Sequence, residues 1–377
     1  MRFRMANRRK PNREFSALHY PARASKYPLK NRFKMFHMEQ CIDNKDMNIS
    51  RRKFLQIPLP LTAAALCRAC SQSDTPADSP KEREKQDASP LAELHKTSPY
   101  IPDPHRREIL AQIQRRADAC ENTEFEAYCA NAQSSNTPPA SAPQIMRDFE
   151  YAFETIAGKL ANKPRPKSGA RLYLLYNMGY IVQTPTTTFG IDIVHTQTER
   201  IAELLDFLLI THRHADHYSP ALVRHMGSKP VVSNFIENGF KQNSDTKNYK
   251  FGGIDIAATL THHGSRLPKF NSTFEIACLD TAEKIRILHV GDAGKYEQIK
   301  PSRCPDVFIP HVSVGLDIKK CAEETIKPRL LLMSHLLELG HPTYKWRHPL
   351  SLGLAKCDSI KGTAAIMPFW GECVEVG

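Results

Sequence analysis

Apolar and polar residues along the chain follow two different periods, one typical of helices and one typical of short strands. Apolar residues recur at helical spacing over residues 105–132 and again over residues 145–160. A loop rich in serine, proline and asparagine separates the two runs at residues 134–143. The pattern therefore predicts an N-terminal helical segment over residues 92–165, which we expect to form a lid or cap.

Strand-like runs dominate the chain from residue 170 onward. The run at residues 207–211 is almost wholly apolar, which is typical of a strand buried on both faces of a sheet. Other strand-like runs occupy residues 171–177, 180–184, 189–194, 229–233, 254–260, 272–279, 285–290, 307–310 and 330–334. Helical patterns fall between them at residues 198–205, 220–226 and 321–326. This mixture predicts a layered α/β sandwich over residues 166–377.

Positive charge is concentrated at the N-terminus of the chain. The formal net charge is +12 over 377 residues, and residues 1–53 hold 15 Lys and Arg against 4 Asp and Glu. The rest of the chain holds 37 against 36 and is nearly neutral. A protein that binds nucleic acid usually carries its basic patch on the folded domain. The charge distribution therefore argues against a nucleic-acid partner.

Residues 47–70 resemble a twin-arginine export signal. Arg51 and Arg52 precede an apolar stretch at residues 55–66, whose length is that of a signal-peptide core. The alternative is a surface helix that carries two arginines. The resemblance implies recognition by the twin-arginine export machinery and a periplasmic or envelope-attached location.

The segments around this signal are polar and irregular. Cys70 follows a small residue in a weak match to a lipoprotein attachment site, so a membrane tether through Cys70 and simple cleavage nearby both stay open. Residues 1–46 lack apolar periodicity, and we interpret them as an over-extended reading frame or a disordered basic arm. Residues 71–91 contain no aromatic residue and are rich in Ser, Asp, Pro, Lys and Glu, so we expect a disordered linker.

The cysteines downstream of the signal form no C-x-x-C pair, so the sequence offers no structural-zinc or redox motif. Cys120 and Cys129 lie close together in the helical segment and could form a disulfide in an oxidising compartment. We expect the remaining cysteines to be buried thiols.

Histidines gather in the predicted sandwich, where twelve of the sixteen lie between His195 and His348. Directly after the apolar run at residues 207–211, four candidate ligands fall within six residues: His212, His214, Asp216 and His217. A loop at the end of a buried strand can present such side chains from a fixed backbone. Imidazole and carboxylate ligands together suit Zn²⁺, with Mn²⁺ or Fe as alternatives. The pattern therefore predicts a metal site.

The motif His-x-His-x-Asp-His after a buried strand resembles the metallo-β-lactamase-like superfamily of metal-dependent hydrolases. The other residues of that superfamily's signature stand in the expected order around the motif: Asp192, His262 or His263, Asp292 and His335. The resemblance implies a four-layer αββα sandwich, preceded in this chain by the helical segment.

The resemblance also implies a role for each of these residues. The implied ligands of the first of two zinc ions are His212, His214 and one of His262 and His263. The implied ligands of the second are Asp216, His217 and His335. Asp292 would bridge the two ions, and Asp192 would orient the loop that carries the motif. Asp216 and Asp292 are the expected catalytic residues.

The implied activity is that of an exported dinuclear zinc hydrolase. In such an enzyme a metal-bound hydroxide cleaves an ester, lactone or phosphodiester bond of a small-molecule or lipid substrate. The stretch His-His-Gly-Ser-Arg at residues 262–266 also weakly resembles phospholipase-D-like phosphodiesterases, so an enzyme acting on envelope lipids is one alternative. A non-catalytic envelope metal-binding protein is the other.

Two histidine assignments stay open. His262 forms a His-x-x-x-Arg spacing with Arg266, whereas two small residues follow His263. His341 competes with His335 for the last ligand position, and His335 is preferred because it directly ends an apolar strand-like run. His341 is then a candidate for substrate contact or proton transfer, or an ordinary loop histidine.

Overall fold

The computed structural model describes residues 89–131, 138, 142–236, 239–341, 343 and 346–377. The predictions for residues 1–46, for the export signal at residues 47–70 and for Cys70 lie outside the described residues. The predicted linker at residues 71–91 is described only at its end, where helix α3 (Pro90–Leu94) already begins. Within the described part of the chain, no helix is both long and apolar enough to cross a membrane.

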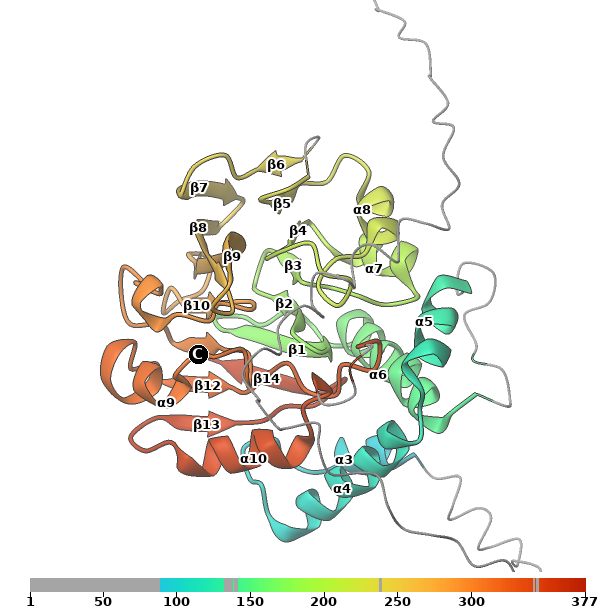
Figure 1. Ribbon diagram of the computed structural model, residues 1–377. Helices are drawn as coiled ribbons and strands as arrows, with labels where there is room; N and C mark the ends of the chain where they lie inside the picture. The colour runs from blue at the N-terminus through green and yellow to red at the C-terminus, as the bar shows by residue number, and fades with distance from the viewer. Residues whose placement is uncertain (1–88, 132–137, 139–141, 237–238, 342, 344–345) are drawn as a thin grey trace, which may run out of the picture. The chain divides into compact units, whose positions relative to one another are not determined.

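Two seven-stranded sheets of mixed strand direction form the centre of the fold (Figure 1). The first sheet, in spatial order, consists of β14 (Cys373–Val376), β1 (Ala170–Tyr176), β2 (Gly179–Gln183), β3 (Thr188–Ile191), β4 (Phe207–Leu209), β5 (Val231–Ser233) and β6 (Phe240–Lys241). The second consists of β13 (Ala364–Ile366), β12 (Leu330–Leu332), β11 (Val307–Ile309), β10 (Arg286–His289), β9 (Leu267–Cys278), β8 (Ile254–His263) and β7 (Thr246–Phe251). The predicted layered α/β sandwich is confirmed.

Strand β1 is buried on both faces, because successive residues of a strand point to opposite sides. Leu172 and Leu174 belong to a core cluster that also contains Phe274 of the second sheet. Tyr173 and Leu175 belong to a separate cluster with residues of three helices. The first sheet therefore packs against the second sheet on one face and against helices on the other. This double burial explains why its strands appear as nearly continuous apolar runs.

Helices complete the layers on both sides of the strands. The helices whose residues pack on the outer face of the first sheet are α6 (Gln144–Asn162), α7 (Thr198–Leu204) and α8 (Pro220–Met226). The others after α3 are α4 (Pro104–Asp118), α5 (Asn122–Asn131), α9 (Ile318–Lys320) and α10 (Leu350–Ser359), with a 3₁₀ turn η2 (Tyr296–Gln298) and a π-helical turn η3 (Cys321–Thr325). Helix α10 contacts β13 at the edge of the second sheet.

The N-terminal helices pack into the main core instead of forming a separate lid. Phe149 of α6 lies edge-on to Tyr176 of β1, with ring centroids 5.2 Å apart, and Phe125 of α5 lies edge-on to Phe149 at the same separation. Ile113 of α4 and Trp370, near the C-terminus, belong to the same cluster. The change of periodicity near residue 165 is therefore not the edge of the core.

The helical run predicted over residues 105–132 is two helices in the structure, α4 and α5. Arg347, which is far away in sequence, contacts the C-terminal end of the first of them. Its Nη1 donates to the carbonyl oxygens of Cys120 and Ala117, at 2.5 and 3.4 Å. The buried guanidinium thus adds hydrogen bonds to carbonyl groups at the end of a helix, where the regular helical partners run out. Apolar spacing alone could not reveal this break.

Cys120 and Cys129 are free thiols in the structure, so the disulfide considered between them is not formed. Burial raises the pKa of the thiol to about 11 at Cys120 and to about 12 at Cys129. Because the thiolate is the reactive form, neither cysteine is activated near neutral pH.

Candidate metal centre

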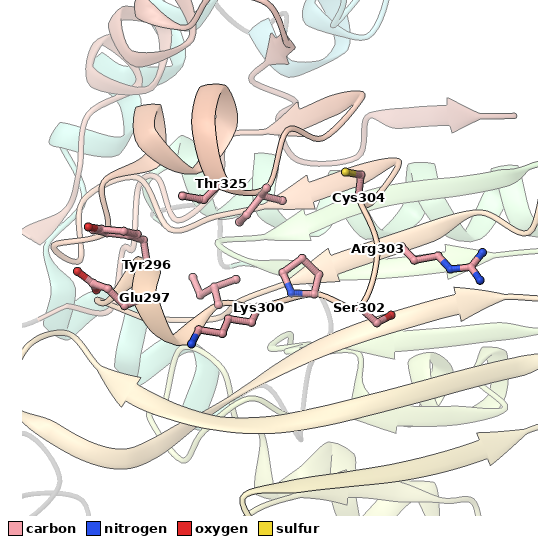
Figure 2. Close-up of a pocket in the computed structure, with 10 residues that line it drawn as sticks. Tyr296, Glu297, Lys300, Ser302, Arg303, Cys304 and Thr325 are labelled. Atoms are coloured by element: carbon pink, nitrogen blue, oxygen red, sulfur yellow. The ribbon is translucent and has the colours of Figure 1, made fainter.

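A surface cavity of about 480 Å³ opens beside the 3₁₀ turn η2 (Figure 2). Tyr296, Lys300, Arg303 and Cys304 are among the residues that line it. None of the histidines and aspartates proposed from the sequence as metal ligands lines this cavity. The candidate chemistry therefore lies in the histidine and aspartate cluster described next.

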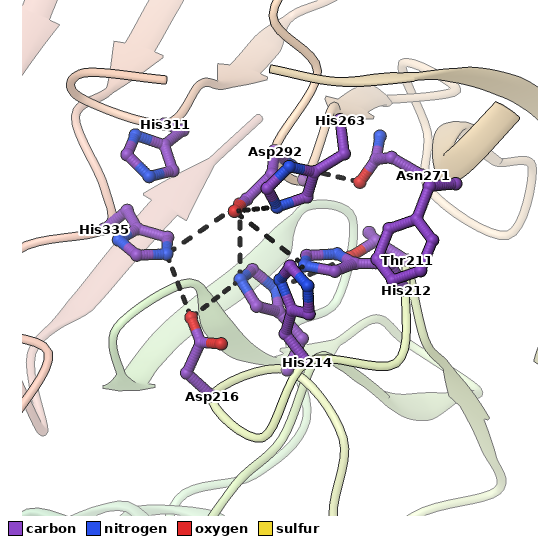
Figure 3. Close-up of polar contacts among 12 residues, drawn as sticks. Thr211, His212, His214, Asp216, His263, Asn271, Asp292, His311 and His335 are labelled. Atoms are coloured by element: carbon purple, nitrogen blue, oxygen red, sulfur yellow. Dashed lines mark hydrogen bonds and ion pairs between the residues drawn. The ribbon is translucent and has the colours of Figure 1, made fainter. Parts of the chain in front are cut away.

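Loops that follow strands of both sheets bring the predicted ligands together (Figure 3). The motif loop follows β4 of the first sheet, and His263 ends β8 of the second. Asp292 and His335 follow β10 and β12, which run in the same direction as the intervening β11. The ends of parallel strands meet at the same edge of a sheet, and ligands commonly bind there. Residues far apart in sequence thus share a single site.

The first group consists of His212, His214, His263 and Asp292, whose ligand atoms lie within 4.8 Å of one another. His262 is not part of it. The backbone N–H of His262 donates to Gln298 Oε1 at 2.9 Å, and its Nδ1 is in a short hydrogen bond with the Gln298 side-chain amide. The structure thereby separates the two neighbouring histidines that the sequence left as alternatives.

An irregularity in strand pairing explains why the sequence left this choice open. Pairing between β8 and β9 shifts register between Thr261 and His263. Between these pairs β8 advances by two residues and β9 by four, from Asn271 to Leu267, so the extra residues lie in β9. Regular pairing thus breaks off where the two histidines stand, and the alternation of the preceding pairs does not determine which of them turns toward the ligands.

The second group consists of Asp216, His217 and His335. Asp216 Oδ2 lies 3.0 Å from the Nε2 atoms of both histidines. Asn177, which the sequence analysis did not single out, donates from Nδ2 to the same oxygen at 2.8 Å. The backbone carbonyl oxygen of Asn177 also accepts the backbone N–H of His335 at 3.1 Å. Asn177 occupies the turn between β1 and β2 with a φ of +54°, a conformation that asparagine tolerates well.

Asp292 lies between the two groups, with one carboxylate oxygen turned toward each. Its Oδ2 is 3.0 Å from His263 Nε2 and 3.8 Å from His212 Nε2. Its Oδ1 is 3.2 Å from His217 Nε2 and 3.8 Å from His335 Nε2. One carboxylate is thus within reach of both groups of candidate ligands.

Glycine at position 291 allows Asp292 to reach this position. Gly291 has a φ of +51°, and a Cβ atom there would lie 2.4 Å from Asn271 Oδ1 and 2.7 Å from Thr211 Cβ. A side chain would therefore collide with both neighbours. Asn271 Oδ1 also accepts the backbone N–H of Asp292 at 3.0 Å, which fixes the start of this loop.

Asp192 lies behind the motif loop, as the sequence predicted. Its Oδ1 accepts the backbone N–H of Thr211 at 2.7 Å, and its Oδ2 accepts the Thr211 hydroxyl at 2.7 Å. His217 Nδ1 lies 2.8 Å from the same Oδ2. Because a carboxylate only accepts, Nδ1 of His217 carries the hydrogen and Nε2 presents its lone pair to the centre.

The protonation of the histidines suits metal binding. Burial lowers the pKa of His214 to about 3 and that of His212 well below its usual range, so both rings are neutral near pH 7. Burial also opposes a charge on His217, but the carboxylates of Asp216, Asp292 and Asp192 outweigh it and raise its pKa. The raised pKa means that the ring of His217 holds a second proton in the absence of metal. A cation bound among these carboxylates would replace that proton and balance their charge.

Three buried atoms without hydrogen-bond partners show whether the residues present could bind a metal. His217 Nε2, His263 Nε2 and Asp292 Oδ1 have no hydrogen-bond partner among the described residues. Buried polar atoms seldom lack a hydrogen-bond partner, and a protein core that binds no ligand gives no reason for three such atoms in one cluster. Nitrogen and carboxylate donors are ligands that Zn²⁺ accepts. The residues present therefore fit bound cations.

His311 also lies in the cluster, although the sequence analysis did not select it. A ring nitrogen of His311, an oxygen of Asp292 and a ring nitrogen of His335 lie within 4.8 Å of one another. The signal was available, because His311 directly follows the strand-like run at residues 307–310, just as His335 ends another run. His341 belongs to none of these groups and stacks on Trp346, with ring centroids 5.1 Å apart.

The carboxylate of Asp192 provides a first test of the centre. The two carboxylate oxygens of Asp192 together accept three hydrogen bonds, two from Thr211 and one from His217 Nδ1. In an Asp192→Asn variant one of these oxygens becomes an NH₂ group, so the amide cannot accept all three. We expect the affinity for zinc to fall about 10- to 100-fold, because His217 loses the partner that fixes its tautomer. Competition with a zinc-binding dye measures this affinity.

Asp206→Asn is the matched control, because Asp206 accepts a backbone N–H from Thr188 at 2.8 Å and lies outside the centre. It should bind zinc like the wild type. Equal zinc affinities for the Asp192 variant and the wild type would contradict the orienting role.

Comparisons with known proteins found a similarity for the part of the chain that carries this centre. Residues 172–334 match the family model described as a beta-lactamase superfamily domain. The matched region contains each predicted ligand except His335, which follows it directly. This part of the chain is thus similar to that domain. A search of curated proteins gave no match.

Solved structures show similarity over about half of the chain. One is Igni18, a metallo hydrolase from the archaeon Ignicoccus hospitalis, with 18% identity and a TM-score of 0.45 over 56% of this chain and 99% of that chain. Another is CmlA, a diiron β-hydroxylase from Streptomyces venezuelae, with 16% identity and a TM-score of 0.39 over 57% of this chain and 55% of that chain.

Proposed function

We propose that the protein is a metal-dependent hydrolase that cleaves an ester, lactone or phosphodiester bond at a centre for two cations. The observation that carries the proposal is the position of Asp292, whose Oδ2 faces His263 while its Oδ1 faces His217. A protein that only stores metal has no need for a carboxylate shared between two adjacent groups of ligands. A hydrolytic centre does, because both cations must act on one substrate.

Each group would hold one cation, zinc being the ion that this donor set suits best. The first would lie among His212, His214 and His263, and the second among Asp216, His217 and His335, with Asp292 shared. When bound, the cations would supply an activated water and polarise the bond to be cleaved.

The protein's own side chains would orient the reaction. Asp216, held by Asn177 at 2.8 Å, would accept a hydrogen bond from the attacking water and fix its direction. Asp192 would keep His217 in the tautomer that binds metal. Because the ligands come from strand ends of both sheets, the scaffold would hold them in place without a large rearrangement on binding.

Among the three bond types, the surroundings of the first group favour a phosphodiester with an apolar neighbouring group, as in a lipid. The Phe270 ring packs against His212, His214 and His263, with centroids 5.0 to 5.7 Å away. The Arg213 guanidinium lies over the same ring, 5.2 Å from its centroid. An apolar wall next to a cation suits a substrate that combines an apolar part with a negative charge.

The metal content of the purified full-length chain tests this proposal. We expect two zinc ions per chain by elemental mass spectrometry after purification without chelators and with added zinc. Removal of zinc with a chelator should abolish hydrolysis of phosphodiester, lactone or ester substrates, and added zinc should restore it.

A His225→Asn variant serves as the control for this measurement. His225 is on α8, where its Nδ1 lies 3.0 Å from the Thr198 hydroxyl, and the variant should keep both ions. One ion or none in the wild type would contradict the two-cation centre. Two ions without hydrolysis of any of these substrate classes would favour a metal-binding protein without catalysis.

A further inference from the structure

His311 lies against the second group of ligands, in a position where a histidine could be taken for a further metal ligand. The loop after β11 carries it, and its side chain is buried. Its ring stacks on the ring of His335, with centroids 3.7 Å apart and an angle of 26° between the planes. One of its ring nitrogens lies within 4.8 Å of both an Asp292 oxygen and a His335 nitrogen (Figure 3).

The hydrogen bonds around His311 determine which of its nitrogens carries the hydrogen. The backbone N–H of Ser313 donates to His311 Nδ1 at 2.8 Å. A backbone N–H can only donate, so Nδ1 must present a lone pair. In a neutral imidazole the single N–H is then on Nε2. His311 therefore presents an N–H donor to the centre, where a metal ligand would present a lone pair.

Two ligand histidines of the motif loop, His212 and His217, have the opposite arrangement. His217 Nδ1 faces the carboxylate of Asp192 at 2.8 Å and so carries the hydrogen. His212 Nδ1 lies 2.9 Å from the Thr211 hydroxyl, whose own hydrogen goes to Asp192 Oδ2, so this nitrogen also donates. In both rings Nε2 keeps its lone pair for a cation. The fold thus gives Nδ1 of His311 a hydrogen-bond donor, whereas Nδ1 of His212 and of His217 faces an acceptor.

We propose that His311 is a substrate-binding residue of this centre and not a ligand of its metals. Its Nε2–H would donate a hydrogen bond to an oxygen of the acyl or phosphoryl group under attack, next to the position of the second cation. This inference rests on the proposed hydrolytic function. A neutral donor suits the place, because it neither competes for a cation nor repels one, and it stabilises an oxygen on which negative charge develops.

Two substitutions at this position separate the roles of its two nitrogens. In His311→Gln the side-chain NH₂ lies near the place of Nε2 and can still donate to the substrate. In His311→Asn the amide reaches only the place of Nδ1, so the contact with the Ser313 N–H survives while the donor is lost. We expect kcat to fall about 100-fold in His311→Asn and less than about tenfold in His311→Gln.

Zinc content distinguishes this role from that of a ligand. Both His311 variants should keep two zinc ions per chain, whereas His335→Asn should lose one. Loss of a zinc ion from His311→Asn would overturn the proposal. Equal losses of kcat in the two His311 variants, with equal losses of thermal stability, would also overturn it, because they would indicate a structural role.

A measurement without turnover tests the same inference. In the zinc-loaded full-length chain labelled with ¹⁵N-histidine, long-range ¹H–¹⁵N spectra should show His311 in the Nε2–H form, and inorganic phosphate should shift that signal. An Nδ1–H form, or no response to phosphate, would overturn the proposal. The expected tautomer and phosphate response in a protein that hydrolyses nothing would support the donor role and overturn the hydrolytic function instead.

Discussion

Replacing Asp292 with asparagine is expected to abolish hydrolysis, with kcat reduced about 1,000-fold or more. The carboxylate faces His263 with Oδ2 and His217 with Oδ1, and an amide retains only one oxygen that can bind a cation. The variant should therefore hold at most one zinc ion firmly. Steady-state kinetics and elemental mass spectrometry on the same preparation measure both effects.

Asp245→Asn is the control for this substitution. The same change from carboxylate to amide is made here at the surface, because the Asp245 side chain is largely exposed. It pairs with Lys269 at 2.8 Å. The control should match the wild type in zinc content and activity. An Asp292→Asn protein that retains two zinc ions and normal turnover would show that Asp292 does not bridge the groups.

Loss of Arg106 is expected to produce the largest loss of stability. Arg106 on α4 forms a two-pronged ion pair with Glu372, Nη1 to Oε1 and Nη2 to Oε2, both at 2.6 Å. The two side chains are almost completely buried. Replacing Arg106 with methionine leaves a buried carboxylate without its counter-charge, which costs about 3–5 kcal/mol in free energy of unfolding. Urea denaturation followed by circular dichroism measures this loss.

The neighbouring ion pair provides a matched control. Arg107 pairs with Asp358 at 2.9 Å, but both side chains are substantially exposed, so Arg107→Met should cost less than about 1 kcal/mol. A double Arg106→Met, Glu372→Gln variant should be more stable than Arg106→Met alone, because no unpaired charge stays buried. Equal stability of the Arg106 and Arg107 variants would show that the buried pair does not fasten α4 to the core.

Much of the centre could be predicted because its residues lie in a short, dense motif. His212, His214, Asp216 and His217 follow a buried strand, and local sequence places them in one loop whatever the remaining fold. Asp292 and His335 were selected through the family resemblance, which expects a ligand after each of two strand-like runs. The structure brings these residues together in the groups that the sequence proposed. Their roles as ligands stay predictions until metal is measured.

Other residues of the centre gave a weaker local signal. Asn177 appears in the sequence as an ordinary turn residue, and its contacts with Asp216 and His335 arise only when the turn between β1 and β2 reaches the motif loop. His311 directly follows a predicted strand-like run, as His335 does, but only the fold shows that it lies beside the ligands. Such residues depend on contacts between distant segments, which local patterns do not record.

The sequence by itself determined the alternation of helical and strand-like segments, the α/β class and the chemistry of the motif. These features depend on periodicity and side-chain type, which are local properties. The tertiary structure alone decided that His263 and not His262 joins the ligands, because regular pairing between β8 and β9 breaks off at these residues and His262 is held by Gln298. It also decided that His311 presents an N–H, because the hydrogen bond from Ser313 depends on the path of the loop after β11.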